Sequence, residues 1–347
     1  MTKRTTLLVL LLLFFSRGAQ LGAAATAGRD AAPRAAVPAC TSPVRTEDSV
    51  WLISTRHLGC PSSSDGQAPN FQVQRYDDST GWSEAKPDQL LTDDASQRPA
   101  VIYVHGNRED WATAQQRGLT AYHSLVNVMG NPPPLRFLIW SWPADSIRGL
   151  RRDVLAKAAR SDYEAYYLAQ FLAASDPPAR VGLFGFSYGA RIITGALHLL
   201  GGGTLVGLKL PEGTAAGEHQ ARVVLMAAAL HDFWLLPDNS HGKCWSQIDR
   251  LLVQYNPCDR VLRLYPHLDR CARPWALGYS GFPWSGQLGD DIPRFAQQNV
   301  SCEIGNQHQS LSYLESPAVM VQVQRYVLWL DGREEGKDEG RRMKNEE

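Results

Sequence analysis

The segment from Arg180 to Thr194 constrains the fold of this chain more than any other. It begins with a short apolar run typical of a buried strand, continues as Gly-Phe-Ser-Tyr-Gly at 185–189, and enters a helical pattern that extends to Leu200. Glycines two residues before and after a serine let the backbone turn sharply where a strand and a helix nearly touch. Such a turn exposes the hydroxyl of Ser187 on a strained backbone, which suits a nucleophile. The pentapeptide alone arises easily by chance, but the flanking strand and helix are the context that the motif requires.

Strand-like apolar runs alternate with helix-like stretches along the rest of the chain. The middle strands are continuous apolar runs, which is the pattern of parallel strands covered on both faces. The sequence therefore predicts an α/β fold in which a mostly parallel central sheet of about eight strands carries helices on both faces. The expected strands are Val50–Ser54, Phe71–Tyr76, Ala100–Val104, Arg136–Trp140, Arg180–Phe184, Arg222–Ala227, Leu251–Tyr255 and Val300–Ile304. The expected helices are Trp111–Val128, Arg151–Ala174, Tyr188–Leu200 and Pro317–Trp329.

The composition is that of a globular protein, with 44% apolar and 20% charged residues in 347. The formal net charge is zero, so no basic field attracts nucleic acid and we expect no nucleic-acid partner. We find no internal repeat and no second linker. One domain is therefore expected over residues 46–330, between an Ala/Pro-rich linker at 26–45 and a charged, disordered tail at 331–347.

The N-terminus has the order of a secretory signal peptide. Lys3 and Arg4 precede an apolar run from Leu7 to Phe15, and small residues follow around Gly22–Ala25. The run is too short to span a bilayer, which needs about 20 residues. We therefore expect a signal peptide over residues 1–25, a secreted or periplasmic protein, and no stable membrane span after cleavage. An uncleaved signal anchor is the alternative.

The cysteine count fits export. An even number of cysteines, six here, in an exported chain favours disulfides. No Cys-x-x-Cys pair occurs, so a structural zinc site has little support. We expect Cys40 to pair with Cys60, and the other four to pair among themselves: Cys244, Cys258, Cys271 and Cys302.

Polar residues at the carboxyl ends of the late strands are the candidates for chemistry, because α/β sheets place their sites there. A serine nucleophile needs a base, and the base needs an orienting acid, in the chain order Ser, Asp, His on sheets that carry a serine elbow. Asp259 follows the strand Leu251–Tyr255 and is the expected acid. A helix N-cap is the alternative role of Asp259, and Asp232, one strand earlier, is the rival acid.

His308 is the expected base. It lies in a polar loop after the last expected strand, whereas His267, also downstream of Asp259, lies in an expected helical region. The loop after Val104 reads His-Gly-Asn, and its His105 is expected to brace that loop by hydrogen bonds rather than act as the base. Backbone N–H groups must meet the oxyanion of an acyl-transfer intermediate, and those of Tyr188 and Asn107 are the expected donors.

These residues together resemble the α/β-hydrolase superfamily, in its serine esterase/lipase-like branch, and within it a little-characterised group of microbial esterases. The likeness extends over residues 50–330. It rests on Val104-His-Gly-Asn107, Ile139-Trp-Ser-Trp-Pro143 and Gly185-Phe-Ser-Tyr-Gly189, with Asp259 and His308 at the expected positions. The resemblance implies the α/β-hydrolase fold and hydrolysis of carboxylic esters. The first loop lacks the His-Gly-Gly-Gly of many lipases, which argues against bulky tertiary-alcohol esters.

The hypothesis is an exported serine hydrolase that forms an acyl-enzyme on Ser187, with His308 as base and Asp259 as the orienting acid. The reaction needs no metal and no organic cofactor, and the expected partner is a small-molecule or lipid-like acyl ester. Aromatic side chains near the strand ends either line an acyl pocket or, more often, pack: Trp140, Trp142, Phe233 and Trp234. The alternatives are an amidase, peptidase or acyltransferase with the same triad, and a non-catalytic binding module on the same fold.

Overall fold

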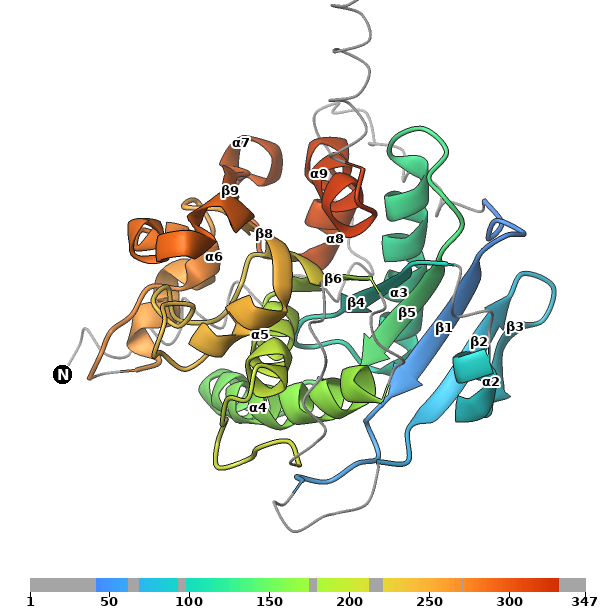
Figure 1. Ribbon diagram of the computed structural model, residues 1–347, viewed down its shortest axis with the longest axis horizontal. Helices are drawn as coiled ribbons and strands as arrows, with labels where there is room; N and C mark the ends of the chain where they lie inside the picture. The colour runs from blue at the N-terminus through green and yellow to red at the C-terminus, as the bar shows by residue number, and fades with distance from the viewer. Residues whose placement is uncertain are drawn as a thin grey trace, which may run out of the picture.

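A single nine-stranded sheet organises the protein (Figure 1). The computed structural model describes residues 42–61, 69–92, 98–174, 180–211, 221–269 and 271–330. The strand order is β3-β2-β1-β5-β4-β6-β7-β8-β9. The pairs β1–β2 and β2–β3 are antiparallel, and every other pair is parallel. The strands are β1 Ser49–Ser54, β2 Gln72–Asp77, β3 Gly81–Ala85, β4 Ala100–Val104, β5 Arg136–Ser141, β6 Val181–Phe186, β7 Ala221–Met226, β8 Ile248–Tyr255 and β9 Phe295–Asn299.

The long helices cover both faces of the sheet. In Figure 1, α3 (Trp111–Asn127) and α9 (Pro317–Val327) lie on one side, and α4 (Leu150–Ala173) and α5 (Tyr188–Leu200) lie on the other. Every residue of α5 is buried because this helix lies between the sheet and α4. The short helices are α2 Pro87–Thr92, η2 Gly242–Gln247, η3 Leu262–His267, α6 Leu277–Ser280, η4 Ser285–Gln287, η5 Gly289–Arg294, α7 Ser301–Ile304 and α8 Ser310–Leu314.

The predicted α/β architecture, a mostly parallel sheet with helices on both faces, is confirmed. The central strands β4, β6 and β7 are buried along their whole length, as their continuous apolar sequences require. Because neighbouring strands are parallel, the loops that follow β4, β6, β7 and β8 meet at one edge of the sheet. We call it the carboxyl edge.

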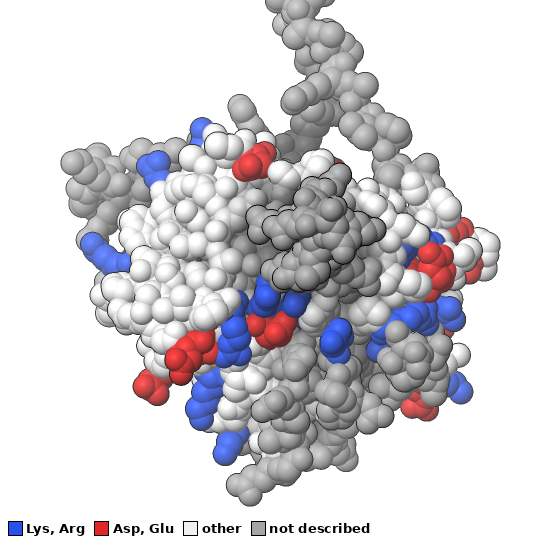
Figure 2. All heavy atoms as spheres, turned by 45° about the horizontal axis from the view of Figure 1, so that its top comes forward, with Lys and Arg blue, Asp and Glu red and all other residues white. Residues whose placement is uncertain are grey.

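Charged side chains of both signs lie side by side on one face of the molecule. Figure 2 shows Lys and Arg interspersed with Asp and Glu on the visible face, with no large patch of one sign. This distribution agrees with the formal net charge of zero. No helix in the described part of the chain is both long enough and apolar enough to cross a membrane.

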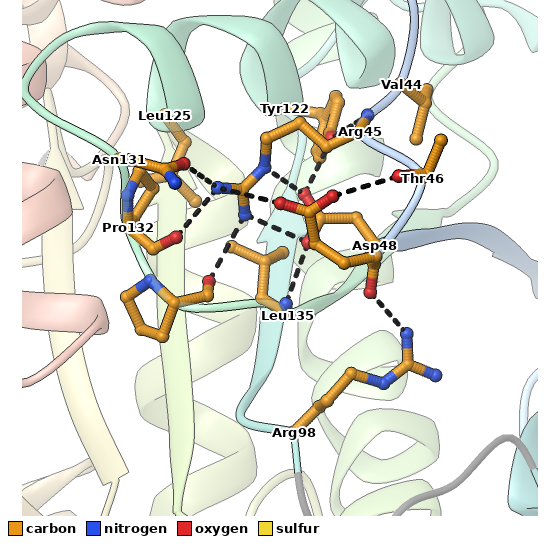
Figure 3. Close-up of polar contacts among 12 residues, drawn as sticks. Val44, Arg45, Thr46, Asp48, Arg98, Tyr122, Leu125, Asn131, Pro132 and Leu135 are labelled. Carbon is orange, nitrogen blue, oxygen red and sulfur yellow. Dashed lines mark hydrogen bonds and ion pairs between the residues drawn. The ribbon is translucent and has the colours of Figure 1, made fainter.

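An ion pair between a half-buried arginine and a buried aspartate fixes the chain where it enters the sheet (Figure 3). Arg45 donates from Nε to Asp48 Oδ2 at 2.8 Å and from Nη2 to Oδ1 at 2.9 Å. The same carboxylate accepts from the Tyr122 hydroxyl at 2.7 Å and from the Leu135 N–H at 2.9 Å. Asp48 directly precedes β1, Leu135 directly precedes β5, and Tyr122 is on α3. We call this cluster the Asp48 anchor. It holds two strands and a helix together at the amino edge of the sheet.

Two strand predictions need correction. The expected strand Val300–Ile304 is wrong: β9 ends at Asn299 and α7 spans Ser301–Ile304. The Asn299 side chain accepts from the N–H of Ser301 at 3.0 Å, which turns the chain away from the strand. The hairpin strand β3 was not expected, so the sheet has nine strands where about eight were predicted.

The predicted pairing of the four later cysteines is also wrong. All five cysteines within the described ranges are free, and Cys244 is buried whereas Cys258, Cys271 and Cys302 are exposed. A disulfide needs Cα atoms within about 7 Å, and an even count carries no information about position. Cys40 lies outside the described residues, as do the signal peptide at 1–25, most of the 26–45 linker and the tail at 331–347.

Candidate active site

Ser187 stands at the tight turn between β6 and α5. Its φ of 56° and ψ of −115° lie in a region that non-glycine residues rarely adopt. A Cβ on Gly189 would lie 2.0 Å from the Val104 carbonyl oxygen, and one on Gly185 would lie 2.7 Å from the carbonyl carbon of Gly189. Only glycine fits at both positions, as the motif predicted. The turn is tied to the sheet because the N–H of Ser187 donates to the Met226 carbonyl at 2.9 Å.

The structure brings Ser187, His308 and Asp259 together in one hydrogen-bonded row. His308 Nε2 lies 3.0 Å from Ser187 Oγ, and His308 Nδ1 lies 2.7 Å from Asp259 Oδ2. The three residues come from the ends of β6 and β8 and from the loop at 305–309, which follows α7. With Nδ1–H directed to the carboxylate, Nε2 is free to take a proton from the serine.

Asp259 takes the first of the two roles that the sequence left open, that of the acid beside His308. The alternative role is wrong, because the N-cap of η3 is Val261 and this helix has no side-chain cap. Asp259 Oδ1 accepts from the N–H groups of Val261 at 2.8 Å and Leu262 at 2.9 Å, which closes the turn before η3. Its Oδ2 accepts from His308. The rival acid Asp232 lies elsewhere, where its N–H donates to the Trp275 carbonyl at 3.1 Å. Burial raises the pKa of Asp232.

An aromatic pair, Phe186 and Tyr313, supports the imidazole of His308. The ring of Phe186, directly before the serine, lies 4.9 Å from the His308 ring, and Tyr313 of α8 packs edge-on against Phe186. The side chain of His308 is 10% exposed, whereas the side chain of Asp259 is fully buried. The acid is thus shielded from water and the base keeps limited access to it.

The β4–α3 loop (residues 105–110) lies against the serine turn. Arg108 has a φ of 63°, and its N–H donates to the Ala144 carbonyl at 2.8 Å, which fixes the bend of the loop. The N–H groups of Asn107 and Tyr188 donate to no acceptor within the described part of the chain. Tyr188 directly follows Ser187, and residues 104–106, just before Asn107, pack against the serine turn. Uncommitted N–H groups are what an oxyanion site requires.

Asp153 of α4 is a site residue that the sequence did not reveal. It is fully buried, and its carboxylate accepts from Asn107 Nδ2 at 3.3 Å, Arg108 Nε at 3.1 Å and the Ile147 N–H at 3.1 Å. Through its contacts with Asn107 and Arg108, Asp153 ties the β4–α3 loop to the first turn of α4. Its sequence context, Arg-Arg-Asp-Val on an amphipathic helix, carries no signal of this role.

His105 braces the loop, as predicted. It is fully buried, its Nδ1–H donates to the Gly106 carbonyl at 2.8 Å, and its Nε2 accepts from the Trp142 N–H at 3.3 Å. Burial lowers the pKa of His105 to about 3, so the ring stays neutral.

The tryptophans near the strand ends pack rather than line a pocket. Trp142 stacks on His105, and Trp140 packs against Phe71 and Phe171; both tryptophans are fully buried. Phe233 and Trp234 are half-buried. Trp234 lies under the guanidinium of Arg191, 4.6 Å from its ring centroid.

Comparisons with known proteins find likeness only among solved structures. No family model matches the chain, and no curated protein matches it by sequence. Acyl-protein thioesterase 2 from Zea mays is similar at 17% identity and a TM-score of 0.38, covering 67% of this chain and 93% of that one. A cutinase-like protein from Cryptococcus sp. has 14% identity and a TM-score of 0.32, covering 67% and 94%. Acetyl xylan esterase 1 from Thermoanaerobacterium sp. has 13% identity and a TM-score of 0.30, covering 76% and 86%. Values this low assign neither a substrate nor a site residue.

Proposed function

We propose that the protein is a serine hydrolase that cleaves carboxylic esters through an acyl-enzyme on Ser187. The observation that supports this most is the row Asp259–His308–Ser187, whose two hydrogen bonds measure 2.7 and 3.0 Å. Nucleophile, base and orienting acid lie within hydrogen-bond reach of one another on a strained turn, which is the arrangement that activates a serine hydroxyl.

The first half of the reaction forms the acyl-enzyme. Ser187 Oγ attacks the ester carbonyl carbon while its proton moves to His308 Nε2, and Asp259 stabilises the imidazolium through Nδ1–H. The N–H groups of Tyr188 and Asn107 hold the oxyanion. The C–O bond to the alcohol then breaks, and His308 returns the proton to the leaving alkoxide oxygen.

The second half uses water. His308 removes a proton from a water molecule that attacks the acyl carbon, and the serine oxygen leaves with that proton, releasing a carboxylic acid. The scheme uses no metal ion or organic cofactor. A small-molecule or lipid-like acyl ester is the proposed substrate. An amide as substrate, or another alcohol in place of water, would use the same acyl-enzyme.

Covalent labelling tests the proposal. A fluorophosphonate should label the wild-type protein at Ser187 and abolish hydrolysis of p-nitrophenyl esters. Ser187→Ala should take no label and lose about 10⁴-fold or more in kcat, with its thermal midpoint nearly unchanged, because alanine fits the same backbone. A folded wild-type protein that takes no label would overturn the proposal. Esters of graded acyl length, set beside the matching amides, identify the preferred acyl group and separate esterase from amidase.

A further inference from the structure

A buried carboxylate beside the site has no part in that mechanism. Glu109 belongs to the β4–α3 loop, directly before the N-cap of α3, and only 1% of it is exposed. A carboxylate is almost never this buried unless its charge is compensated. Its partners therefore indicate why it is there.

The carboxylate of Glu109 contacts two elements at once. Its Oε1 accepts from Arg117 Nη1 of α3 at 2.8 Å and from Ser310 Oγ of α8 at 3.3 Å. Arg117 Nη1 also donates to Ser310 Oγ at 3.1 Å, which closes a triangle. The Glu109 carbonyl accepts from Arg56 Nη2 at 2.7 Å, so the loop that follows β1 is held as well.

Ser310 is the link to the catalytic row. It is 1% exposed, it opens α8, and it follows His308 by two residues. Glu109 in turn follows Asn107 by two residues in the β4–α3 loop. One carboxylate thus joins the loop that carries the proposed oxyanion donor to the loop that carries the proposed base.

We infer that Glu109 is a positioning residue that sets His308 relative to Ser187 through Ser310. The inference rests on the proposed function, because it assigns a role toward the same base. Holding reacting groups in register acts on the transition state, and a misplacement of about 1 Å can cost 10²-fold in rate. Loss of Glu109 should therefore lower kcat more than it changes KM.

The environment of Glu109 makes its charge sensitive to pH. Arg117 and Arg56 are the cations that face it, the neutral His105 has Nδ1 at 3.8 Å from Oε2, and the hydroxyl of Tyr103 lies buried nearby. Burial raises the pKa of Glu109 to about 7 and outweighs the lowering by Arg117 and Arg56. The hydrogen bond from Ser310 is strongest when Glu109 is ionised. Positioning should thus improve as pH rises through neutrality.

The experiment compares Glu109→Gln and Ser310→Ala with the wild type, following kcat and KM for a p-nitrophenyl ester from pH 5 to 9. Both variants should lose about tenfold in kcat with KM changed by less than about twofold. The rising limb of kcat/KM in the wild type should contain one ionisation, that of Glu109, which is absent from the same limb in Glu109→Gln. The double variant should lose less than the product of the single losses, because both residues act through one contact.

Glu164→Gln is the matched control. Glu164 is also fully buried, accepts from Thr55 Oγ1 at 2.6 Å and pairs with Arg160 at 2.6 Å, but no contact joins it to the 305–309 loop among the described residues. Burial raises the pKa of Glu164 to about 6. Loss of the Glu164 carboxylate should leave kcat and the rising limb of kcat/KM as in the wild type.

Each outcome decides the inference. If Glu109→Gln keeps the wild-type kcat and pH profile while the wild type is labelled and active, the positioning role is wrong and the proposed function stands. If the wild type is neither labelled nor active, both fall together. Should Glu109→Gln fail to fold, the smaller change Ser310→Ala decides, and wild-type kinetics in that variant overturn the inference.

Discussion

The two edges of the sheet each carry a buried carboxylate paired with arginine, and the two clusters differ in how completely they are satisfied. At the amino edge, the two oxygens of Asp48 accept four hydrogen bonds, from Arg45 Nε and Nη2, the Tyr122 hydroxyl and the Leu135 N–H. At the carboxyl edge, Glu109 Oε1 is shared between Arg117 and Ser310, and Oε2 has no hydrogen-bond partner among the described residues. A saturated cluster stabilises the fold.

The cluster around Glu109, in which one carboxylate oxygen has no donor among the described residues, needs a different explanation from the Asp48 anchor. A buried oxygen without a donor costs free energy, so a sequence selected for stability alone would remove it. The other oxygen of Glu109 contacts α3 and α8, and its carbonyl accepts from Arg56 in the loop after β1. The comparison predicts that changes at the amino edge alter the free energy of unfolding, and that changes at the carboxyl edge alter kcat.

The largest expected effect is at the carboxyl edge, in Asp259→Asn. Asparagine retains an oxygen that can accept from the N–H groups of Val261 and Leu262, but its amide cannot orient the imidazole as a carboxylate does. We expect kcat to fall by about 10³–10⁴-fold, as in other triads that lose the acid, while the thermal midpoint changes little. Ester hydrolysis and circular dichroism measure the two. A variant with wild-type kcat would remove Asp259 from the mechanism.

Asp48→Ala should produce the opposite result. It leaves the buried Tyr122 hydroxyl and Leu135 N–H without their acceptor, and each such loss costs about 1–3 kcal/mol in the free energy of unfolding. The kcat of the molecules that remain folded should not change. Urea denaturation gives the stability, and active-site titration with a fluorophosphonate normalises the rate. Asp249→Ala is the control: Asp249 pairs with Arg222 at 2.7 Å but its side chain is 36% exposed, so its loss should cost less than about 1 kcal/mol.

Stability should also depend on pH through the carboxyl edge. Below the ordinary pKa of 4.5 Glu109 is protonated in both states, whereas between 4.5 and about 7 the folded protein keeps a proton that the unfolded chain has released. The favourable contribution is therefore present at low pH and is lost as pH rises through about 7. We expect a loss of about 1–3 kcal/mol over this range. It should be absent from Glu109→Gln; parallel curves of unfolding free energy against pH for the two proteins would contradict it.

The fold was predictable wherever the apolar pattern is local. The helix Tyr188–Leu200 was predicted to the residue, and the central strands to within a few residues, because burial on both faces leaves continuous apolar runs. The strand β3 and the edge strand β9 were missed because their sequences, Gly-Trp-Ser-Glu-Ala and Phe-Ala-Gln-Gln-Asn, are largely polar or exposed. Pairing with a neighbour holds them as strands, and propensity does not show it.

The residues of the candidate site also fall into two groups, those that the sequence predicted and those that it did not. The chain order of serine, acid and base was enough to select Ser187, Asp259 and His308, which the structure brings together. The rule of strand ends holds for the serine and the acid, whereas the base follows α7 and not the expected strand. The supporting residues were invisible because their contacts are non-local. Ser310 and Glu109 are 201 positions apart, and Asn107 and Asp153 are 46 apart. No periodicity or motif in a single sequence encodes such a pair.

Asp153→Asn gives the smallest effect and the finest test of the comparison. The carboxylate holds Asn107, Arg108 and Ile147 through three contacts of 3.1–3.3 Å but has none with the catalytic row among the described residues. An asparagine keeps one acceptor, so the loop should stay closed but hold the Asn107 N–H less firmly. Loss of a whole oxyanion donor costs about 10²–10³-fold in kcat, and a loosened one should cost about tenfold or less. The loss should be in kcat, with KM and the unfolding free energy nearly constant. If stability falls and kcat does not, Asp153 belongs with Asp48 as a structural residue, and the division between the two edges of the sheet does not extend to α4.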